Sequence, residues 1–244
     1  MKLSILYPTH NESQNIYFRE NLERFGDLDC ANTEILFADS GSDDITVDLI
    51  KEHNFKVLQN AGNSRGERLQ NAFLESQGQL ILLHHPRSIL GPTAFEKISN
   101  LQVSQFRWGY FKHQFDDSHP LLSFTSWYSN NIRSKFRSII YLDHCLLIRR
   151  DLLLHVGGIP QIDIFEDTKL SEGLREICSA APIDCVSRTS AIRFREGGLF
   201  KHSLKNQYLK LKYLFGGYSY ELNEIYESRK PLNSSSNEVK KEVD

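Results

Sequence analysis

Short apolar runs of strand length alternate with helical patterns in the first 84 residues of this 244-residue chain. The runs that predict strands are residues 3–7, 34–38, 55–59 and 79–84. The segments between them repeat apolar residues at helical spacing and are residues 13–25, 45–53 and 65–77. This βαβ series predicts an α/β fold with a mostly parallel central sheet and helices on both faces.

Polar segments follow three of the predicted strands. They are PTHNE at 8–12, DSGSDD at 39–44 and HHPRS at 84–88. Ligands of such sheets bind beyond the carboxyl ends of the strands. We therefore expect these three segments to converge on one crevice.

The second half of the sequence is less regular. Its patterns predict strands at 106–116 and 145–150 and helices at 121–136, 166–178, 203–215 and 218–227. The last segment, 229–244, has no apolar periodicity, so we expect a disordered tail. One domain over residues 1–228 is the simplest organisation.

Composition narrows the class of protein. The formal net charge of -2 gives no global attraction to nucleic acid or anionic lipid. No apolar run approaches the roughly 20 residues that a membrane span needs, and the N-terminal segment does not fit a signal peptide, so we expect a cytoplasmic protein. The four cysteines have no metal-binding spacing and are interpreted as reduced thiols.

Several motifs in order resemble glycosyltransferase family 2. LSILYPTHNE at 3–12 resembles the family's first strand and turn, and EILFADSGSDDIT at 34–46 resembles its second strand and acidic loop. Segments 64–78, 143–175 and 189–200 are similar to a branch of small soluble transferases linked to arsenosugar biosynthesis. The resemblance covers about residues 3–215 and implies a GT-A fold and inverting transfer of a sugar from a uridine or guanosine diphosphate donor to an unknown acceptor.

The resemblance also implies a nucleotide site. Asp39 is expected to accept a hydrogen bond from the uracil N–H, although an Asx-turn explains the same residue. Arg65 is expected to supply a cation to the nucleotide from a helix start, where a merely solvated charge would oppose the helix dipole. The other expected donor contacts are Pro8, Thr9, Asn11, Glu12, Ser40 and Gly41. For Asn11 and Glu12, an N-cap of helix 13–25 is nearly as good an explanation.

Asp167 is the candidate general base. In the resembling family an acidic pair that opens a helix takes the proton of the acceptor hydroxyl, and here that pair is Glu166 and Asp167. A plain helix cap is the structural alternative, because carboxylates are favoured at a helix N-terminus for the same electrostatic reason.

The acidic metal motif of the family is not intact. An Asp is expected two residues after His84, yet the sequence has Pro86, which weakens the expectation of Mn²⁺ or Mg²⁺ without removing a histidine-bound softer metal. His84 is expected to contact the substrate, although adjacent strand residues point to opposite faces. Without a metal, the diphosphate charge would be balanced by basic residues, of which the candidates are Arg87, Arg193, Arg195, Lys201 and His202.

Three alternatives stand beside an active transferase. A non-catalytic relative would bind a nucleotide or a protein partner. A dinucleotide oxidoreductase is disfavoured because no GxGxxG follows the first strand. Helix 203–215, basic on one side and aromatic on the other, fits weak contact with a membrane surface, but a packed terminal helix is the commoner use of such a pattern.

Overall fold

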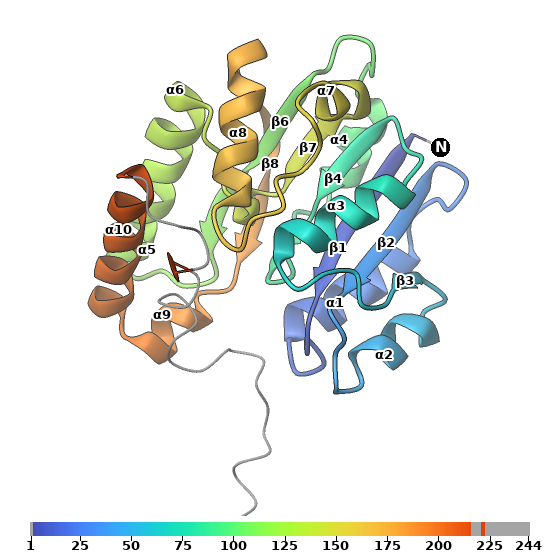
Figure 1. The fold of residues 1–244 in the computed structure, drawn as a ribbon, viewed down its shortest axis with the longest axis horizontal. Coiled ribbons are helices and arrows are strands. Elements are labelled where there is room, and N and C mark those ends of the chain that lie inside the picture. The colour runs from blue at the N-terminus through green and yellow to red at the C-terminus, as the bar shows by residue number, and fades with distance from the viewer. Residues whose placement is uncertain (1, 216–220, 223–244) are drawn as a thin grey trace, which may run out of the picture.

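The computed structural model describes residues 2–215, 221 and 222. This part of the chain contains one eight-stranded sheet with the order β3-β2-β1-β4-β7-β6-β8-β5 (Figure 1). The strands are β1 Leu3–Thr9, β2 Thr33–Asp39, β3 Lys56–Leu58, β4 Leu80–Leu83, β5 Ser88–Leu90, β6 Trp108–Phe115, β7 Leu146–Arg149 and β8 Ala181–Thr189.

The helices lie between these strands and after the last one. The α-helices are α1 Ile16–Gly26, α2 Thr46–Glu52, α3 Arg65–Glu75, α4 Ala94–Asn100, α5 Pro120–Tyr128, α6 Lys135–Arg137, α7 Arg150–His155, α8 Glu166–Ile177, α9 Ile192–Gly197 and α10 Leu199–Leu214. A π-helical turn, η1 Ser129–Ser134, joins α5 to α6, and a 3-10 turn, η2 Leu142–His144, precedes β7.

The α/β class is confirmed, and the parallel part of the sheet consists of the four strands of the βαβ series. β1 pairs in parallel with β2 and β4, and β2 pairs in parallel with β3. β7 then runs antiparallel between β4 and β6, which makes the whole sheet mixed. β8 pairs in parallel with β6 and antiparallel with β5.

Helices cover both faces of the sheet, as expected. Alternate residues of each strand point to opposite faces, so Leu6 and Leu83 pack with α3, α7 and α8, whereas Ile5 and Leu82 pack with α1, α2 and α4. Both clusters are rich in fully buried side chains. The sheet therefore has two cores, one on each face.

The second half differs from the prediction in its details. The predicted helix 121–136 is interrupted by η1 and is followed by Ser138 in the left-handed region at φ 49°. β5 and β8 were not predicted, because β5 has only three residues and β8 contains Pro182 and opposes an irregularity between Phe111 and Lys112 of β6. These strands depend on partners that are distant in the sequence.

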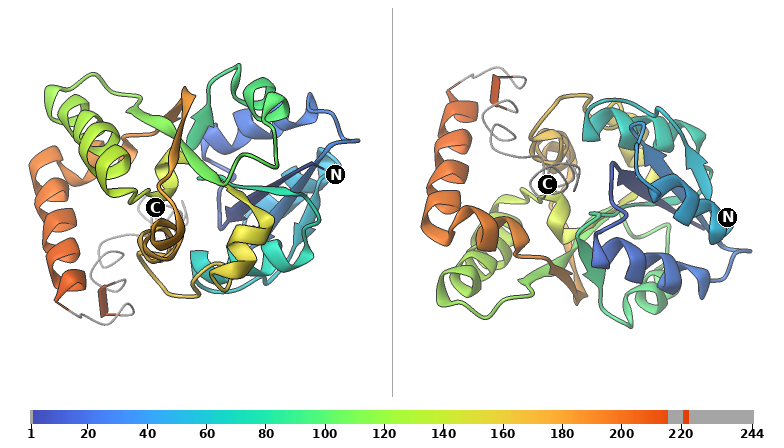
Figure 2. Two further views of the ribbon diagram at one scale, coloured as in Figure 1. Left: turned by 90° about the horizontal axis from the view of Figure 1, so that it is seen from above. Right: turned by 90° about the horizontal axis from the view of Figure 1, so that it is seen from below.

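α10 and α5 lie side by side at one end of the molecule, as both views of Figure 2 show. Leu209 of α10 is buried, whereas Leu204, Tyr208 and Leu211 of the same helix are exposed. No helix within residues 2–215, 221 and 222 is long and apolar enough to cross a membrane. The predicted helix 218–227, apart from 221 and 222, and the predicted tail 229–244 fall outside the described residues.

Candidate functional site

A cavity of about 700 Å³ opens beyond the carboxyl ends of β1, β2 and β4. It lies between the parallel part of the sheet and a wall formed by η1, α8 and α10. Eight of the residues expected at the site line it, and they are Pro8, Thr9, Glu12, Ser40, Arg65, Arg87, Asp167 and Arg193. The three polar segments identified in the sequence therefore converge on one crevice.

Among the described side chains, six expected residues do not line the cavity, and they are Asn11, Asp39, Gly41, His84, Glu166 and Arg195, which pairs with Asp116. Asn11 adopts φ 51°, and its side-chain oxygen accepts a hydrogen bond from the Asp43 backbone N–H at 3.0 Å. Gly41 adopts φ 87°, a conformation that favours glycine. Asn11 and Gly41 thus shape the loops that border the cavity.

Asp39 is fully buried at the end of β2 and its carboxylate is engaged by protein groups. Oδ1 accepts hydrogen bonds from the backbone of Gly41 at 2.8 Å and of Ser42 at 2.7 Å. Oδ2 accepts from Thr9 Oγ1 at 3.0 Å and from Ser42 Oγ at 2.5 Å. The structure therefore shows the Asx-turn that was the alternative to a base contact, and this turn places Thr9 and Ser40 on the cavity wall.

Glu12 is not an N-cap. Helix α1 is capped instead by Asn15, whose side chain accepts a hydrogen bond from the Tyr17 N–H at 3.0 Å. Glu12 Oε2 accepts from Asn15 Nδ2 at 2.8 Å and lies 3.6 Å from Arg87 Nη2. Glu12 thus connects the first loop to the segment that contains Pro86.

His84 does not contact the cavity, and this corrects the expectation that it meets the substrate. Its ring is fully buried and stacks on Tyr7 at 5.2 Å, because it continues the alternation of Leu80 and Leu82 toward the core beneath α1. Burial lowers the pKa of His84 to about 3, so it is neutral. The next residue, His85, points the other way and lines the cavity.

Asp167 lies in the first turn of α8 and its side chain is about 10% exposed. The N-cap position belongs to Phe165, at φ 68°, and carries no side-chain cap. Asp167 Oδ1 accepts from the Thr168 N–H at 2.6 Å, and Oδ2 accepts from the Leu142 N–H at 2.8 Å. The carboxylate thus stabilises the helix start and links it to η2, and these roles leave it on the cavity wall.

Arg65 is bound by both acids of the predicted pair. Its Nε donates to Glu166 Oε1, and its Nη2 lies 3.6 Å from Asp167 Oδ2. Burial and the charge of Glu166 raise the pKa of Asp167 to about 6, although Arg65 opposes that rise. A carboxylate with a pKa near neutrality is suited to accept a proton.

The cavity is more basic than the chain as a whole. Its wall in the described structure carries four carboxylates, Glu12, Asp143, Asp163 and Asp167, and six cations, Arg65, Arg68, Arg87, Arg133, Arg193 and Lys210. The formal charge of the wall is therefore positive by two, in a protein of net charge -2. Clustered cations in a concave site favour a phosphorylated ligand.

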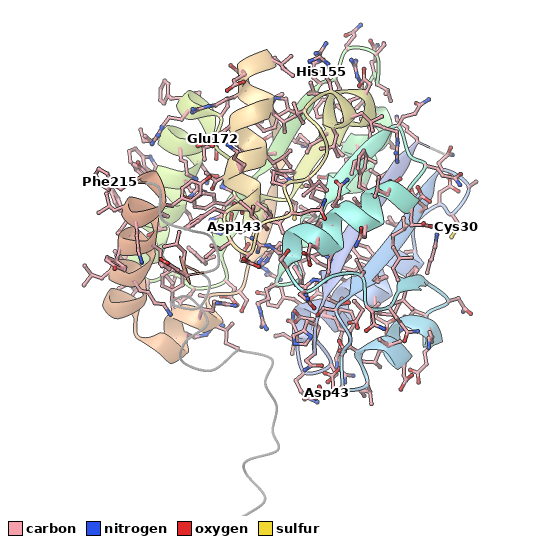
Figure 3. All side chains as sticks on the ribbon, viewed as in Figure 1. Cys30, Asp43, Asp143, His155, Glu172 and Phe215 are labelled. Atoms are coloured by element: carbon pink, nitrogen blue, oxygen red, sulfur yellow. The ribbon has the colours of Figure 1, made fainter. Side chains whose placement is uncertain are left out.

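The polar side of the wall formed by the second half of the chain was not predicted from the sequence. Asp143 lies near the centre of the molecule (Figure 3), with its Oδ2 3.5 Å from His113 Nε2. Arg133, Tyr141 and Lys210 complete this side. Arg133 and Lys210 lie in segments predicted as helices, and Tyr141 lies between predicted elements, so none of the three was expected at the site.

These side chains offer few ligands for a divalent metal. In the described residues no group of three His, Cys, Asp or Glu side chains could hold a metal ion. Pro86 lines the cavity where the family resemblance predicts an acid, and its carbonyl oxygen already accepts hydrogen bonds from Tyr7 and Asn15. The donor set therefore does not fit a tightly bound Mn²⁺ or Mg²⁺.

The chain belongs to glycosyltransferase family 2. A family model described as glycosyl transferase family 2 matches residues 4–157, which is more than half of the sequence. Comparison with curated proteins gives no match.

Solved glycosyltransferase structures share the fold. A structure of S. aureus TarS residues 1–349 with UDP-GlcNAc aligns at TM-score 0.63 and 16% identity, over 78% of this chain and 58% of that one. Glucosyl-3-phosphoglycerate synthase from Mycobacterium tuberculosis, with Mn²⁺, UDP and glucosyl-3-phosphoglycerate, aligns at TM-score 0.54 and 15% identity, over 78% and 70%. The mannosyltransferase PcManGT from Pyrobaculum calidifontis, with GDP-Man and Mn²⁺, aligns at TM-score 0.56 and 17% identity, over 76% and 56%. The chain thus spans about 58% of the TarS fragment, and the GT-A fold predicted from the motifs is confirmed.

Proposed function

We propose that this chain is an inverting glycosyltransferase that binds a nucleoside diphosphate sugar in the cavity and uses Asp167 as its general base. The observation that carries the proposal is the position of Asp167, a carboxylate with a pKa raised to about 6 on the wall of a cavity lined by cations. The relatives with UDP-GlcNAc, UDP or GDP-Man support a uridine or guanosine donor.

The nucleotide is assigned to the side of the cavity formed by the ends of β1 and β2. Pro8, Thr9 and Ser40 lie there, and Arg65 and Arg68 of α3 face the same space. The side chain of Asp39 holds this wall in shape, and its direct contact with the base remains part of the proposal. His85 and Arg87 lie in the loop after β4, and Arg193 of α9 lines the same cavity.

The transfer step is a single displacement. The acceptor oxygen attacks the anomeric carbon from the face opposite the diphosphate, and the new C–O bond forms as the bond to the diphosphate oxygen breaks. The nucleoside diphosphate leaves with that electron pair, and Asp167 takes the proton of the acceptor hydroxyl. The cations of the wall stabilise the charge that develops on the leaving group.

Metal independence is part of this proposal. Two of the solved structures contain Mn²⁺ with UDP or GDP-Man, whereas this cavity offers six cationic side chains in the described residues and a proline at the expected ligand position. Mn²⁺ or Mg²⁺ is therefore expected to add little to nucleotide affinity.

The first test is a thermal-shift titration with UDP, GDP and ADP, each with Mn²⁺ and with EDTA, because a bound nucleotide raises the apparent stability by mass action. Wild type is compared with Arg65→Met and with Arg24→Met, an arginine of α1 that pairs with Glu20 and does not line the cavity. UDP or GDP should stabilise wild type and Arg24→Met, and should stabilise Arg65→Met much less at the same nucleotide concentration. If none of the three nucleotides stabilises wild type, the proposal fails.

A second measurement separates an enzyme from a non-catalytic relative. Release of UDP or GDP from UDP-glucose, UDP-GlcNAc or GDP-mannose is followed in the absence of acceptor, where water replaces the hydroxyl. Slow release that is lost in Asp167→Asn supports catalysis. Nucleotide binding without release from any of these donors, at any pH from 5 to 9, would favour the non-catalytic relative, which the missing acid at Pro86 also suggests.

A further inference from the structure

Two cations flank one tyrosine on the second-half side of the cavity. Arg133 Cζ lies 3.4 Å from the centroid of the Tyr141 ring, and Lys210 Nζ lies 5.1 Å from the same centroid. Arg133 comes from η1 and Lys210 from α10, and all three side chains line the cavity. Cation–π contacts of this kind hold a charge near a surface without neutralising it.

Neither cation forms a direct ion pair with a carboxylate of the described residues. Arg133 is 9% exposed, and across residues 2–215, 221 and 222 neither it nor Lys210 forms an ion pair. Burial and the charge of Arg133 lower the pKa of Lys210 to about 8. Asp143 and Asp167 also act on Lys210 electrostatically, but neither carboxylate forms a direct ion pair with it. A desolvated cation without a direct ion pair is unfavourable, so this pair is suited to an anion that arrives from outside.

Arg133 is also held in place. Its Nη2 donates to Ser129 Oγ and, at 3.1 Å, to His144 Nε2. His144 can accept that bond because its Nδ1 donates to the Phe111 carbonyl at 2.9 Å and burial lowers its pKa to about 3, which keeps the ring neutral. A guanidinium fixed in this way loses little entropy when it binds an anion.

Arg133 and Lys210 lie beside the candidate general base, Asp167. Tyr141 precedes Leu142, whose backbone N–H donates to Asp167 Oδ2 at 2.8 Å. The expected nucleotide contacts lie across the cavity, at the ends of β1 and β2 and the start of α3. The space beside Tyr141 is therefore where an acceptor must lie for its hydroxyl to reach Asp167.

We propose that Arg133 and Lys210 bind an anionic group of the acceptor, a phosphate or a carboxylate, so that this transferase glycosylates acidic acceptors. The inference rests on the proposed function and adds the acceptor class to it. Arginine binds such groups through paired N–H donors, and lysine adds a point charge.

The test measures acceptor binding by calorimetry in the presence of saturating UDP or GDP, whichever nucleotide binds. If neither binds, the probes are titrated into the chain alone. The soluble probes are glucose 6-phosphate, glucuronic acid and glucose. Phosphatidylcholine vesicles with and without undecaprenyl phosphate test the same chemistry on a lipid, because exposed Leu204, Tyr208 and Leu211 lie on the helix that carries Lys210.

The variants are Lys210→Met and Arg133→Lys. Lys212→Met is the matched control, because Lys212 lies on the same helix, pairs with Glu221 at 3.5 Å and does not line the cavity. We expect at least one anionic probe to bind about tenfold or more tightly than glucose in wild type and Lys212→Met. Lys210→Met should lose that preference.

Two outcomes would overturn the inference. One is equal binding of anionic and neutral probes in wild type, which leaves the proposed function intact if UDP or GDP still binds. The other is a loss of nucleotide affinity in Lys210→Met as large as the loss for the probes, which would assign the pair to the donor diphosphate. Preference for glucose 6-phosphate or glucuronic acid over the lipid vesicles would identify a soluble acceptor, and the reverse preference a lipid one.

Discussion

The buried carboxylate of Asp167 serves the helix start and the cavity at once. Its two oxygens accept backbone hydrogen bonds from Thr168 and Leu142, and its charge is opposed by burial and by Glu166. Arg65 pairs with both carboxyls and opposes the rise in the pKa of Asp167. The same environment that makes this carboxylate hard to ionise makes it a base that is useful near neutral pH.

The pH dependence of turnover should reflect the raised pKa of Asp167. The pKa of Asp167 is raised to about 6, so the base is protonated and inactive below that pH and active above it. The acid limb of donor turnover in wild type is expected near pH 6. Arg65→Met removes the cation that lowers this pKa, so its acid limb should move to higher pH, measured at saturating donor. An unchanged limb in Arg65→Met would show that Asp167 is not the titrating group, and Arg24→Met serves as the control.

Substitution of His84 should mainly lower the stability of the fold, whereas substitution of His85 should mainly weaken nucleotide binding. His84→Ala removes a fully buried ring that packs on Tyr7 and Phe25, and it should lower the free energy of unfolding by about 2 to 4 kcal/mol. His85→Ala removes a cavity side chain that accepts a hydrogen bond from the Arg87 N–H at 3.2 Å. It should weaken nucleotide binding about threefold to tenfold with a smaller effect on unfolding. The reverse pattern, measured by denaturant titration and calorimetry, would contradict the orientation of the two rings.

The position of the candidate general base, Asp167, depends on packing between helices as well as on the hydrogen bonds of its carboxylate. The first turn of α3 packs against the segment that leads into α8, and a Cβ at Gly66 would lie 2.3 Å from the Pro160 carbonyl oxygen. Ser64 caps α3 through a reciprocal bond pair with Glu67, which fixes the direction of the helix. α3 thus brings Arg65 to Glu166 and Asp167 only because residue 66 has no side chain.

Two glycine-to-alanine changes test this contact. Gly66→Ala should destabilise the protein by about 1 to 3 kcal/mol and reduce turnover per folded molecule, because the 160–162 segment and α8 must shift. Gly173→Ala in α8 meets only Val156 at 3.8 Å and should stabilise the helix by about 0.5 to 1 kcal/mol. Equal unfolding free energies for the two variants would show that the close approach of α3 is not constrained.

The cavity wall and the whole chain differ in the sign of their net charge. Its formal net charge is -2, yet in the part of the chain that the structure describes the cavity wall is positive. The parallel part of the sheet supplies Arg65, Arg68 and Arg87, and the second half supplies Arg133, Arg193 and Lys210. This distribution suits a diphosphate that is held by side chains from both parts.

Nucleotide affinity is therefore expected to depend on salt more than on metal. UDP or GDP binding to wild type should weaken between 0.05 M and 0.5 M NaCl, because the Debye length falls below about 10 Å near 0.1 M. EDTA should change the affinity by less than about twofold if this account holds. A metal requirement that appears only in Pro86→Asp would support it, whereas strong Mn²⁺ dependence in wild type that is lost in His85→Ala would contradict it.

The sequence by itself determined the elements whose signals are local. The strands of the βαβ series and the helices between them follow from periodicities of two and 3.6 residues, and β1, β2 and β4 carry their polar segments directly after them. Glu166 and Asp167 were placed at a helix start because carboxylates favour that position. Eight of the expected site residues therefore reached the cavity.

Only the tertiary structure decided what depends on distant partners. The pairing of β8 with β6 and β5 and the approach of Arg133, Tyr141 and Lys210 have no local periodic signal. The four hydrogen bonds that Asp39 accepts from protein groups also depend on the tertiary structure, because Thr9 comes from another strand. The sequence alone therefore could not decide between these bonds and a contact with the nucleotide base. Long-range packing decides which face a polar side chain meets, and local sequence does not encode that choice.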